Sequence, residues 1–428
     1  MTDIMALGLT SIRSYTQGLA TISDNVANAQ TPGYARRSTR IEDATVIRYA
    51  DEWRNNEARI ASGLSSQADT RLSWLESAER ALDDGDTGIG RRVSAVFNRA
   101  EELAADPNST ARRSAYLQAI DDAAISFRTT ASGLKSASDG ISAQATQTVT
   151  SLNSDLKGLL NVNQTLLATP QGTSGYASLL DQRDRLLTNV SKAVPVDVSF
   201  DFRGVATIRL SGSGETLLTP DVAGQMGVSP NADGTLAFTA LQPDGTMSSI
   251  VPAGGSLAGM TTAAGDIAER RASVDTLAAN FAKLINDNQA AGKKGNGQPG
   301  DPLLDLGAKG ALTIAALDVG VDAIAAGDGT TANANLTALS AARRGSGIEA
   351  GWTALVADHA QKVQSAKLVQ ESSQARSQAA DEARDQLSGV DLDREAIELM
   401  RLQQSYEAAA RVIQVAREML QSIIQIGG

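Results

Sequence analysis

The 428-residue sequence contains no cysteine and only one histidine, His359. The absence of cysteine excludes disulfide bonds, thiolate nucleophiles and cysteine-based metal sites. A Ser/His/Asp hydrolase would have to use His359, and no Gly-x-Ser-x-Gly elbow accompanies this residue. His359 lies in an alanine- and glutamine-rich helical stretch, so we expect it to be a solvated helix residue. The sequence therefore gives little support to an enzyme.

Aromatic residues, excess positive charge and long apolar runs are also scarce. Aromatic side chains make up 4% of the chain, whereas small residues recur throughout, which is typical of long helices packed through small side chains. The net charge is -11 without a basic cluster, which disfavours nucleic-acid binding. No apolar run approaches the roughly 20 residues that cross a bilayer, so we expect no membrane insertion. Residues 1–9 lack the features of a cleavable signal, which predicts a cytoplasmic protein or an unconventional export route.

Short motifs that resemble ligand sites are better explained as turns. The glycine-rich stretches 212–214 and 295–297 lack the Lys-Ser/Thr pair and the strand-helix context of phosphate loops. Residues 83–86, Asp-Asp-Gly-Asp, resemble part of a calcium loop but lack the glutamate at its terminal ligand position. We therefore assign no cofactor and no metal site.

Three carboxylates crowd the segment 388–395, where two could in principle form an acid and base pair. Their position at the start of a helix favours a structural role instead. Ser388 or Asp391 can cap the exposed amides, and Glu395 suits the positive end of the helix dipole. We therefore assign no catalytic residue.

Both ends of the chain carry apolar stripes at helical spacing. The N-terminal stripe then meets the segment Asn28–Tyr34, where Pro32 and Gly33 end the helix. The C-terminal stripe alternates steps of three and four without a break, which is typical of a coiled-coil seam. Each stripe needs a partner, so we expect the two terminal helices to pair. The stripes comprise Ile4, Gly8, Ile12, Tyr15, Leu19, Ile22 and Val26, and Leu399, Leu402, Tyr406, Ala409, Ile413, Ala416, Leu420 and Ile423.

The middle of the chain reads as helices interrupted by a strand-rich segment. Residues 196–202 alternate apolar and polar side chains, and 205–210 continue after Arg203-Gly204, which predicts a hairpin. Asp233-Gly234 and Asp244-Gly245 predict further turns, and Gly254–Gly259 is expected to close the strand-rich part. Helices are expected over residues 56–83, 91–106, 109–169, 176–193, 266–290 and 351–387.

These patterns predict a mainly α fold with an inserted β domain. We expect a terminal coiled-coil assembly domain (1–50 plus 386–428), a long helical bundle (51–193 plus 262–385) and a small β-rich outer domain (194–261).

Several of these segments also carry a family resemblance. Asn25–Arg37, Asn-Val-Ala-Asn-Ala-Gln-Thr-Pro-Gly-Tyr-Ala-Arg-Arg, resembles the N-terminal signature of flagellar rod, hook and hook-associated proteins. Ser388–Glu395 followed by Leu399–Ile413 looks like the matching C-terminal signature. Within that superfamily, Leu179–Leu187 and Glu102–Pro107, with Arg112-Arg113 soon after, are similar to segments of the hook-associated protein 1 family. The strand-rich part and residues 307–347 carry no such likeness.

The resemblance implies a non-enzymatic structural subunit that polymerises at the distal end of the hook and forms the hook-filament junction. It implies a homo-oligomer in a helical tube, with hook protein and hook-associated protein 3 as neighbours and a flagellar export chaperone as a further partner. It also implies secretion through the flagellar type III apparatus to the extracellular flagellum. The subunit interface would then include Ile12, Tyr15, Leu19, Ile22, Val26, Asn28, Thr31, Pro32, Gly33, Tyr34, Leu399, Leu402, Tyr406, Ile413, Leu420 and Ile423.

Two alternatives remain open at this point. One is another flagellar axial protein, such as hook protein or hook-associated protein 3. The other is a secreted cell-wall hydrolase, although the sequence offers no convincing pair of catalytic carboxylates.

Overall fold

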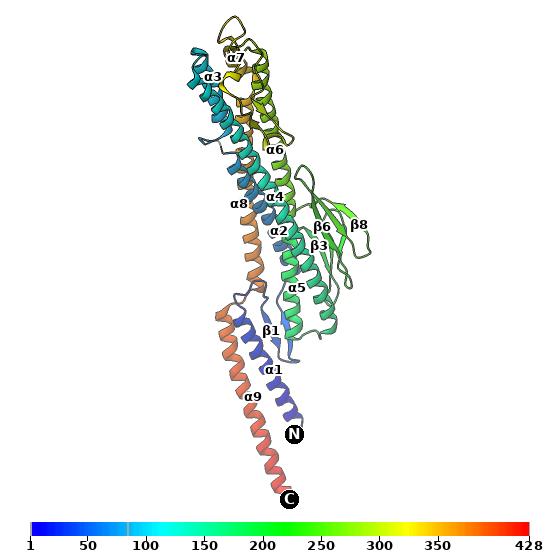
Figure 1. Cartoon of the computed structure of the whole chain (residues 1–428). Helices are drawn as coiled ribbons and strands as arrows, with labels where there is room; N and C mark the ends of the chain where they lie inside the picture. Colours follow the sequence, from blue (N-terminus) through cyan, green and yellow to red (C-terminus); the bar gives the residue numbers. More distant parts are fainter. Residues whose placement is uncertain (1, 84, 428) are drawn as a thin grey trace.

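The computed structural model describes residues 2–83 and 85–427, without the side chains of residues 2–4, 7, 420, 423, 424, 426 and 427. It is a long helical body from whose base a pair of terminal helices projects (Figure 1). The helices are α1 (Thr2–Ala27), α2 (Glu52–Ala81), α3 (Ile89–Ala105), α4 (Thr110–Ala168), α5 (Ser174–Ala193), α6 (Gly255–Ala291), α7 (Ala334–Ser346), α8 (Ile348–Ser388) and α9 (Leu392–Gly427).

The strands lie between these helices in four small antiparallel sheets. A hairpin near the N-terminus joins β1 and β2, two three-stranded sheets follow α5, and a short pair lies after α6. The strands are β1 (Arg37–Arg40), β2 (Thr45–Arg48), β3 (Val196–Phe200), β4 (Ala206–Leu210), β5 (Thr216–Leu218), β6 (Gln225–Pro230), β7 (Leu236–Leu241), β8 (Met247–Ile250), β9 (Leu304–Asp305) and β10 (Ala315–Ala316). The predicted fold class, mainly α with paired terminal helices and a small β-rich part, is confirmed.

Local signals in the sequence explain where the helices of the body begin. The side chain of Asp51 accepts the Arg54 N–H at 2.9 Å at the start of α2, and Thr173 accepts the Tyr176 N–H at 3.1 Å at the start of α5. Buried apolar side chains of α2, α3, α4, α6 and α8 form one continuous core, in which Phe127 and Phe281 stack with ring centroids 5.7 Å apart.

The two three-stranded sheets lie against the helical body rather than apart from it (Figure 1). Apolar side chains such as Ile208 on β4 and Phe238 on β7 are buried and belong to the same core as α4 and α6. The predicted turns at Asp233-Gly234 and Asp244-Gly245 connect β6 to β7 and β7 to β8, and both glycines have positive φ.

The start of α6 differs from the prediction. We expected Gly254–Gly259 to close the strand-rich part, but α6 begins at Gly255, well before residue 266. Gly259 lies where α6 approaches α2, and a Cβ there would come 2.4 Å from the Gln67 carbonyl oxygen. The glycine therefore permits close helix packing, which the sequence does not distinguish from a turn.

The environment of His359 also differs from the prediction. This side chain is 1% exposed between α8 and α2, and its Nε2 lies 2.9 Å from the carbonyl oxygen of Leu75. Burial lowers the pKa of the imidazole below its usual value. The expectation of a solvated residue is wrong, because the small residues around His359 mark a close contact between helices rather than a surface.

No helix within the described residues is both long and apolar enough to cross a membrane.

Candidate functional site

The terminal helices α1 and α9 run antiparallel, so that both chain ends lie at the tip away from the body (Figure 1). Two glycines of α1 permit a close approach of the helices. A Cβ on Gly8 would come 2.6 Å from Ile413 Cγ1, and one on Gly18 would come 2.7 Å from Leu402 Cδ1. Because glycine has no side chain, Leu402 and Ile413 of the C-terminal seam can pack directly on the α1 backbone. The expected pairing of the two helices is confirmed.

The predicted interface residues of the two helices differ in burial. Ile22 and Leu402 are buried, whereas Val26 and Tyr406 are exposed. The side chains of Leu420 and Ile423 lie outside the described residues. The remaining members are half-buried: Ile12, Tyr15, Leu19, Leu399 and Ile413.

The segment after α1 turns the chain back toward the body. The Asn28 N–H donates to the Asp24 carbonyl at 3.0 Å, and the backbone then turns through Thr31, Pro32 and Gly33, which are all exposed. Gly33 has a φ of 76°, which favours glycine. The predicted helix end is confirmed, and these three residues form a surface loop.

Asn25, the first residue of the N-terminal signature, ties this loop to α9. Its side-chain amide donates to the Arg37 carbonyl at 2.8 Å and to Glu395 at 2.9 Å. Its Oδ1 accepts the Arg37 N–H at 3.0 Å and the Tyr34 hydroxyl at 2.9 Å. Both amide hydrogens and the oxygen are therefore satisfied, as a buried amide requires.

Polar contacts at the start of α9 stabilise the break between α8 and α9. Asp391 accepts the N–H groups of Asp393 at 3.0 Å and Arg394 at 3.3 Å, so Asp391 is the cap that the sequence left open between two candidates. Glu395 is buried and accepts the Arg36 guanidinium at 2.7 Å, which goes beyond the dipole role that we expected for it.

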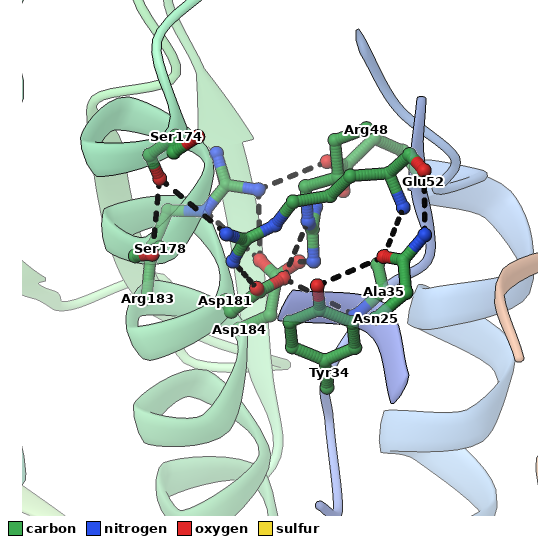
Figure 2. Close-up of polar contacts among 11 residues, drawn as sticks. Asn25, Tyr34, Ala35, Arg48, Glu52, Ser174, Ser178, Asp181, Arg183 and Asp184 are labelled. Atoms are coloured by element: carbon green, nitrogen blue, oxygen red, sulfur yellow. Dashed lines mark hydrogen bonds and ion pairs between the residues drawn. The ribbon is translucent and has the colours of Figure 1, made fainter. Parts of the chain in front are cut away.

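A buried ion network then joins the β1–β2 hairpin to α5 (Figure 2). Asp181 is 2% exposed and accepts both Arg37 and Arg48, the latter at 2.6 Å. Asp184 accepts Arg48 at 2.7 Å and Arg183 at 2.7 Å. Burial alone would raise the pKa of the Asp184 carboxyl, but the two guanidinium groups hold it below its usual value.

This network is suited to holding segments together and not to proton transfer. Each carboxylate is already bound by two guanidinium groups, which remain protonated at any ordinary pH. The sequence drew attention to Leu179–Leu187 only by resemblance and gave no sign of the β1–β2 hairpin. A pair of arginines at the two ends of a short hairpin is the signal that could have located the partners of Asp181.

Helix α9 carries a second apolar face, which is exposed in the monomer. Beyond its first residue, five of its apolar side chains are between 48% and 65% exposed: Ile397, Met400, Val412, Val415 and Met419. At about 100° per residue they lie on one side of the helix, turned away from the α1 contact made by Leu402 and Ile413. We call these five residues the outer face of α9. Exposed apolar side chains of this kind, in two groups at 397–400 and 412–419, are typical of a protein contact surface.

Comparisons with known proteins match this chain to two families of flagellar proteins. The family described as the helical domain of flagellar hook-associated protein FlgK matches residues 75–304, which is more than half of the chain. A second family, the C-terminal region of the flagellar basal body rod FlgEFG proteins, matches residues 385–426 and so covers α9.

Individual relatives are distant. The flagellar hook-associated protein 1 of Salmonella typhimurium is 24% identical over 72% of this chain, and the match spans 60% of that protein's length. The protein of the same name from Bacillus subtilis is 23% identical, with 96% of each chain covered. The structure of the flagellar hook junction protein FlgK from Burkholderia pseudomallei aligns with a TM-score of 0.53 at 21% identity, covering 59% of this chain and 47% of that one.

Proposed function

The chain belongs to the flagellar hook-associated protein FlgK family, and from this premise we propose that it is a structural subunit of the bacterial flagellum. The subunit polymerises at the distal end of the hook and forms the hook-filament junction. Residues 1–50 and 386–428 form its assembly domain, while 51–193 with 262–385, and 194–261, form the body and its outer β part.

The outer face of α9 is the observation that carries this proposal. A monomer that leaves Met400, Val412 and Met419 more than half exposed has apolar surface to bury against a neighbour. Burial of apolar surface contributes about 25 cal/mol per Å², so a row along one helix is a substantial driving force. The seam toward α1 is occupied within the chain, and the outer face is free for contacts between subunits.

Polymer geometry depends on which surface of the next subunit the outer face of α9 contacts. A contact between different surfaces of successive copies generates a helical assembly, whereas a two-fold contact stops at a dimer. We propose that the terminal helices line such a tube, with hook protein below and hook-associated protein 3 above, and that a flagellar export chaperone holds the C-terminal region before export. The subunit is secreted through the flagellar export apparatus and stays in the extracellular flagellum. It has no catalytic role.

Three neighbouring residues of α9 allow a matched test. Val412 lies on the outer face, Ile413 packs at Gly8 of α1, and Gln414 is exposed between the two faces. Each residue is replaced by aspartate, and the variant is expressed in a strain from which the native gene for this protein has been deleted. Attached filaments are counted, and filament protein shed into the medium is measured.

We expect Val412→Asp to fold and be secreted but to leave filament protein unpolymerised in the medium, since a charge would be buried between subunits. Ile413→Asp should also separate α1 from α9 in the monomer, seen as lost helix content in circular dichroism. Gln414→Asp should grow normal filaments. Normal filaments with Val412→Asp would contradict the assembly role of this face.

A further inference from the structure

A large groove lies where the body meets the terminal helices, separate from the outer face of α9. It has a volume of about 1610 Å³. It is lined by α2, α5, the loop of residues 29–36 and the junction of α8 with α9. The volume is far more than a small inorganic ion needs and suits a segment of polypeptide.

One wall of the groove is a polar stripe on α2. Asn55, Arg59 and Ser62 follow one another at helical spacing and all line the groove. Asn55 is 9% exposed and Arg59 is 5% exposed, so both are buried for polar residues. The stripe supplies amide, guanidinium and hydroxyl donors along one line.

Arg59 forms no ion pair with a carboxylate of the described residues. Within residues 2–83 and 85–427 its guanidinium makes a single polar contact, 3.4 Å from Asn56 Oδ1, and no ion pair. The carboxylates that act on it through space, Asp184 and Glu52, are bound by Arg48 and Arg183. Burial lowers the pKa of Arg59 as a consequence. A buried guanidinium whose nearby carboxylates are already paired with other arginines destabilises the monomer, which indicates a partner that the monomer lacks.

Helix α5 adds further cations to the lining. Arg185 and Lys192 line the groove from α5, are exposed and form no ion pair among the described residues. Seven cationic side chains line the groove against four acidic ones, in a chain whose net charge is -11. The cationic residues are Arg36, Arg48, Arg59, Arg185, Lys192, Arg384 and Arg394, and the acidic ones are Asp184, Asp381, Asp385 and Asp391.

We propose that this groove receives a carboxylate-bearing segment of a second copy of the chain, and that Arg59 binds the carboxylate. The inference rests on the proposed function, because a helical polymer of one chain needs two different surfaces that complement each other. The groove is positive and the chain as a whole is strongly negative, so another copy offers the matching charge. A guanidinium already held in a buried stripe binds a carboxylate with little loss of side-chain freedom.

The first test separates a docking role for Arg59 from a structural one. Arg59→Met keeps the length of the side chain and removes the unpaired charge. We expect the purified full-length monomer to melt at the same temperature or higher, and the complemented strain to shed at least about tenfold more filament protein. Arg80→Met, on the same helix and outside the groove, should change neither value.

The second test identifies the occupant. Because the chain has no cysteine, Ser62→Cys introduces a single thiol that can carry a photoactivated cross-linker into the groove. We expect assembled junctions to yield a cross-linked dimer whose second peptide comes from the same protein and contains Asp or Glu. Cross-links to hook protein or to hook-associated protein 3 alone would overturn the proposal.

Comparison with the outer face of α9 separates the two proposals. If Arg59→Met assembles normally while Val412→Asp does not, the groove proposal is wrong and the assembly role stands. If Arg59→Met lowers the melting temperature of the monomer and leaves shedding unchanged, Arg59 is a structural residue and the groove proposal fails. If both variants assemble normally, the proposed function fails as well.

Discussion

Replacing Asp181 by alanine removes the centre of the network that joins the β1–β2 hairpin to α5 (Figure 2). Among the described residues Arg37 loses its one carboxylate partner, and it keeps a weak contact to the Ser174 carbonyl at 3.5 Å and its position over the Tyr34 ring, 4.7 Å from the centroid. Arg48 loses one bond but keeps Asp184 at 2.7 Å. The Ala35 N–H also loses an acceptor, at 3.4 Å. The perturbation therefore falls mainly on Arg37, which is buried.

The size of the effect follows from these contacts. Breaking a buried ion pair by removing one partner costs about 3–5 kcal/mol, because the remaining charge stays buried. Since Arg48 retains Asp184, we expect the lower end of this range, about 3 kcal/mol, for the opening of the hairpin. At about 1.4 kcal/mol per tenfold, this is a change of roughly 100-fold in the opening equilibrium.

Amide hydrogen exchange of residues 37–48 measures this opening directly, because the hairpin can open without the body unfolding. We expect exchange in this segment to be about 100-fold faster in Asp181→Ala, with the body unchanged. Arg40→Ala is the matched control in the same hairpin: its ion pair with Asp43 is exposed to solvent, so its loss should leave the exchange of this segment nearly unchanged. Equal protection in wild type and Asp181→Ala would refute the reasoning.

Three further predictions concern the pH dependence of stability, the packing of α6 and the absence of hydrolytic activity. Burial lowers the pKa of His359 from 6.5, so the unfolded protein binds a proton at this residue more readily than the folded protein does. The free energy of unfolding, measured by urea denaturation, should therefore fall as the pH drops below about 6.5, and His359→Gln should make this fall smaller. Gly259→Ala should destabilise the chain by about 1–3 kcal/mol in the same denaturation assay, because the new Cβ meets the Gln67 carbonyl. Gly265→Ala, on the same helix with open space around it, should stabilise the chain by up to about 1 kcal/mol. Zymography on peptidoglycan should give no cleared band, and a band abolished by replacing one acidic residue would contradict the structural role.

The terminal helices could be predicted from the sequence because their pairing follows a local repeat. Steps of three and four along Leu399, Leu402, Tyr406, Ala409 and Ile413 determine one face of a helix without reference to the rest of the chain. The outer face of α9 was not predicted. Its apolar side chains are visible in the sequence, but only the folded chain shows which of two apolar faces is covered by α1.

The contacts at the base of the body depend on residues far apart in the sequence. β1 and β2 have four residues each, and Arg37 and Arg48 are held by Asp181, more than a hundred positions away. Glu395 was read as a helix-start residue because its partner Asn25 lies at the other end of the chain. Propensity and periodicity describe neighbours along the chain and carry no information about such pairs.

The position of the protein in the flagellum tests the account most directly. The turn at Asp244-Gly245 is exposed, and a Cβ on Gly245 would meet nothing within 4 Å, so an epitope inserted there should be tolerated and accessible. Immunogold labelling of purified flagella should then place gold in one short zone between hook and filament. Label along the filament, along the hook or at the basal body would contradict a junction subunit.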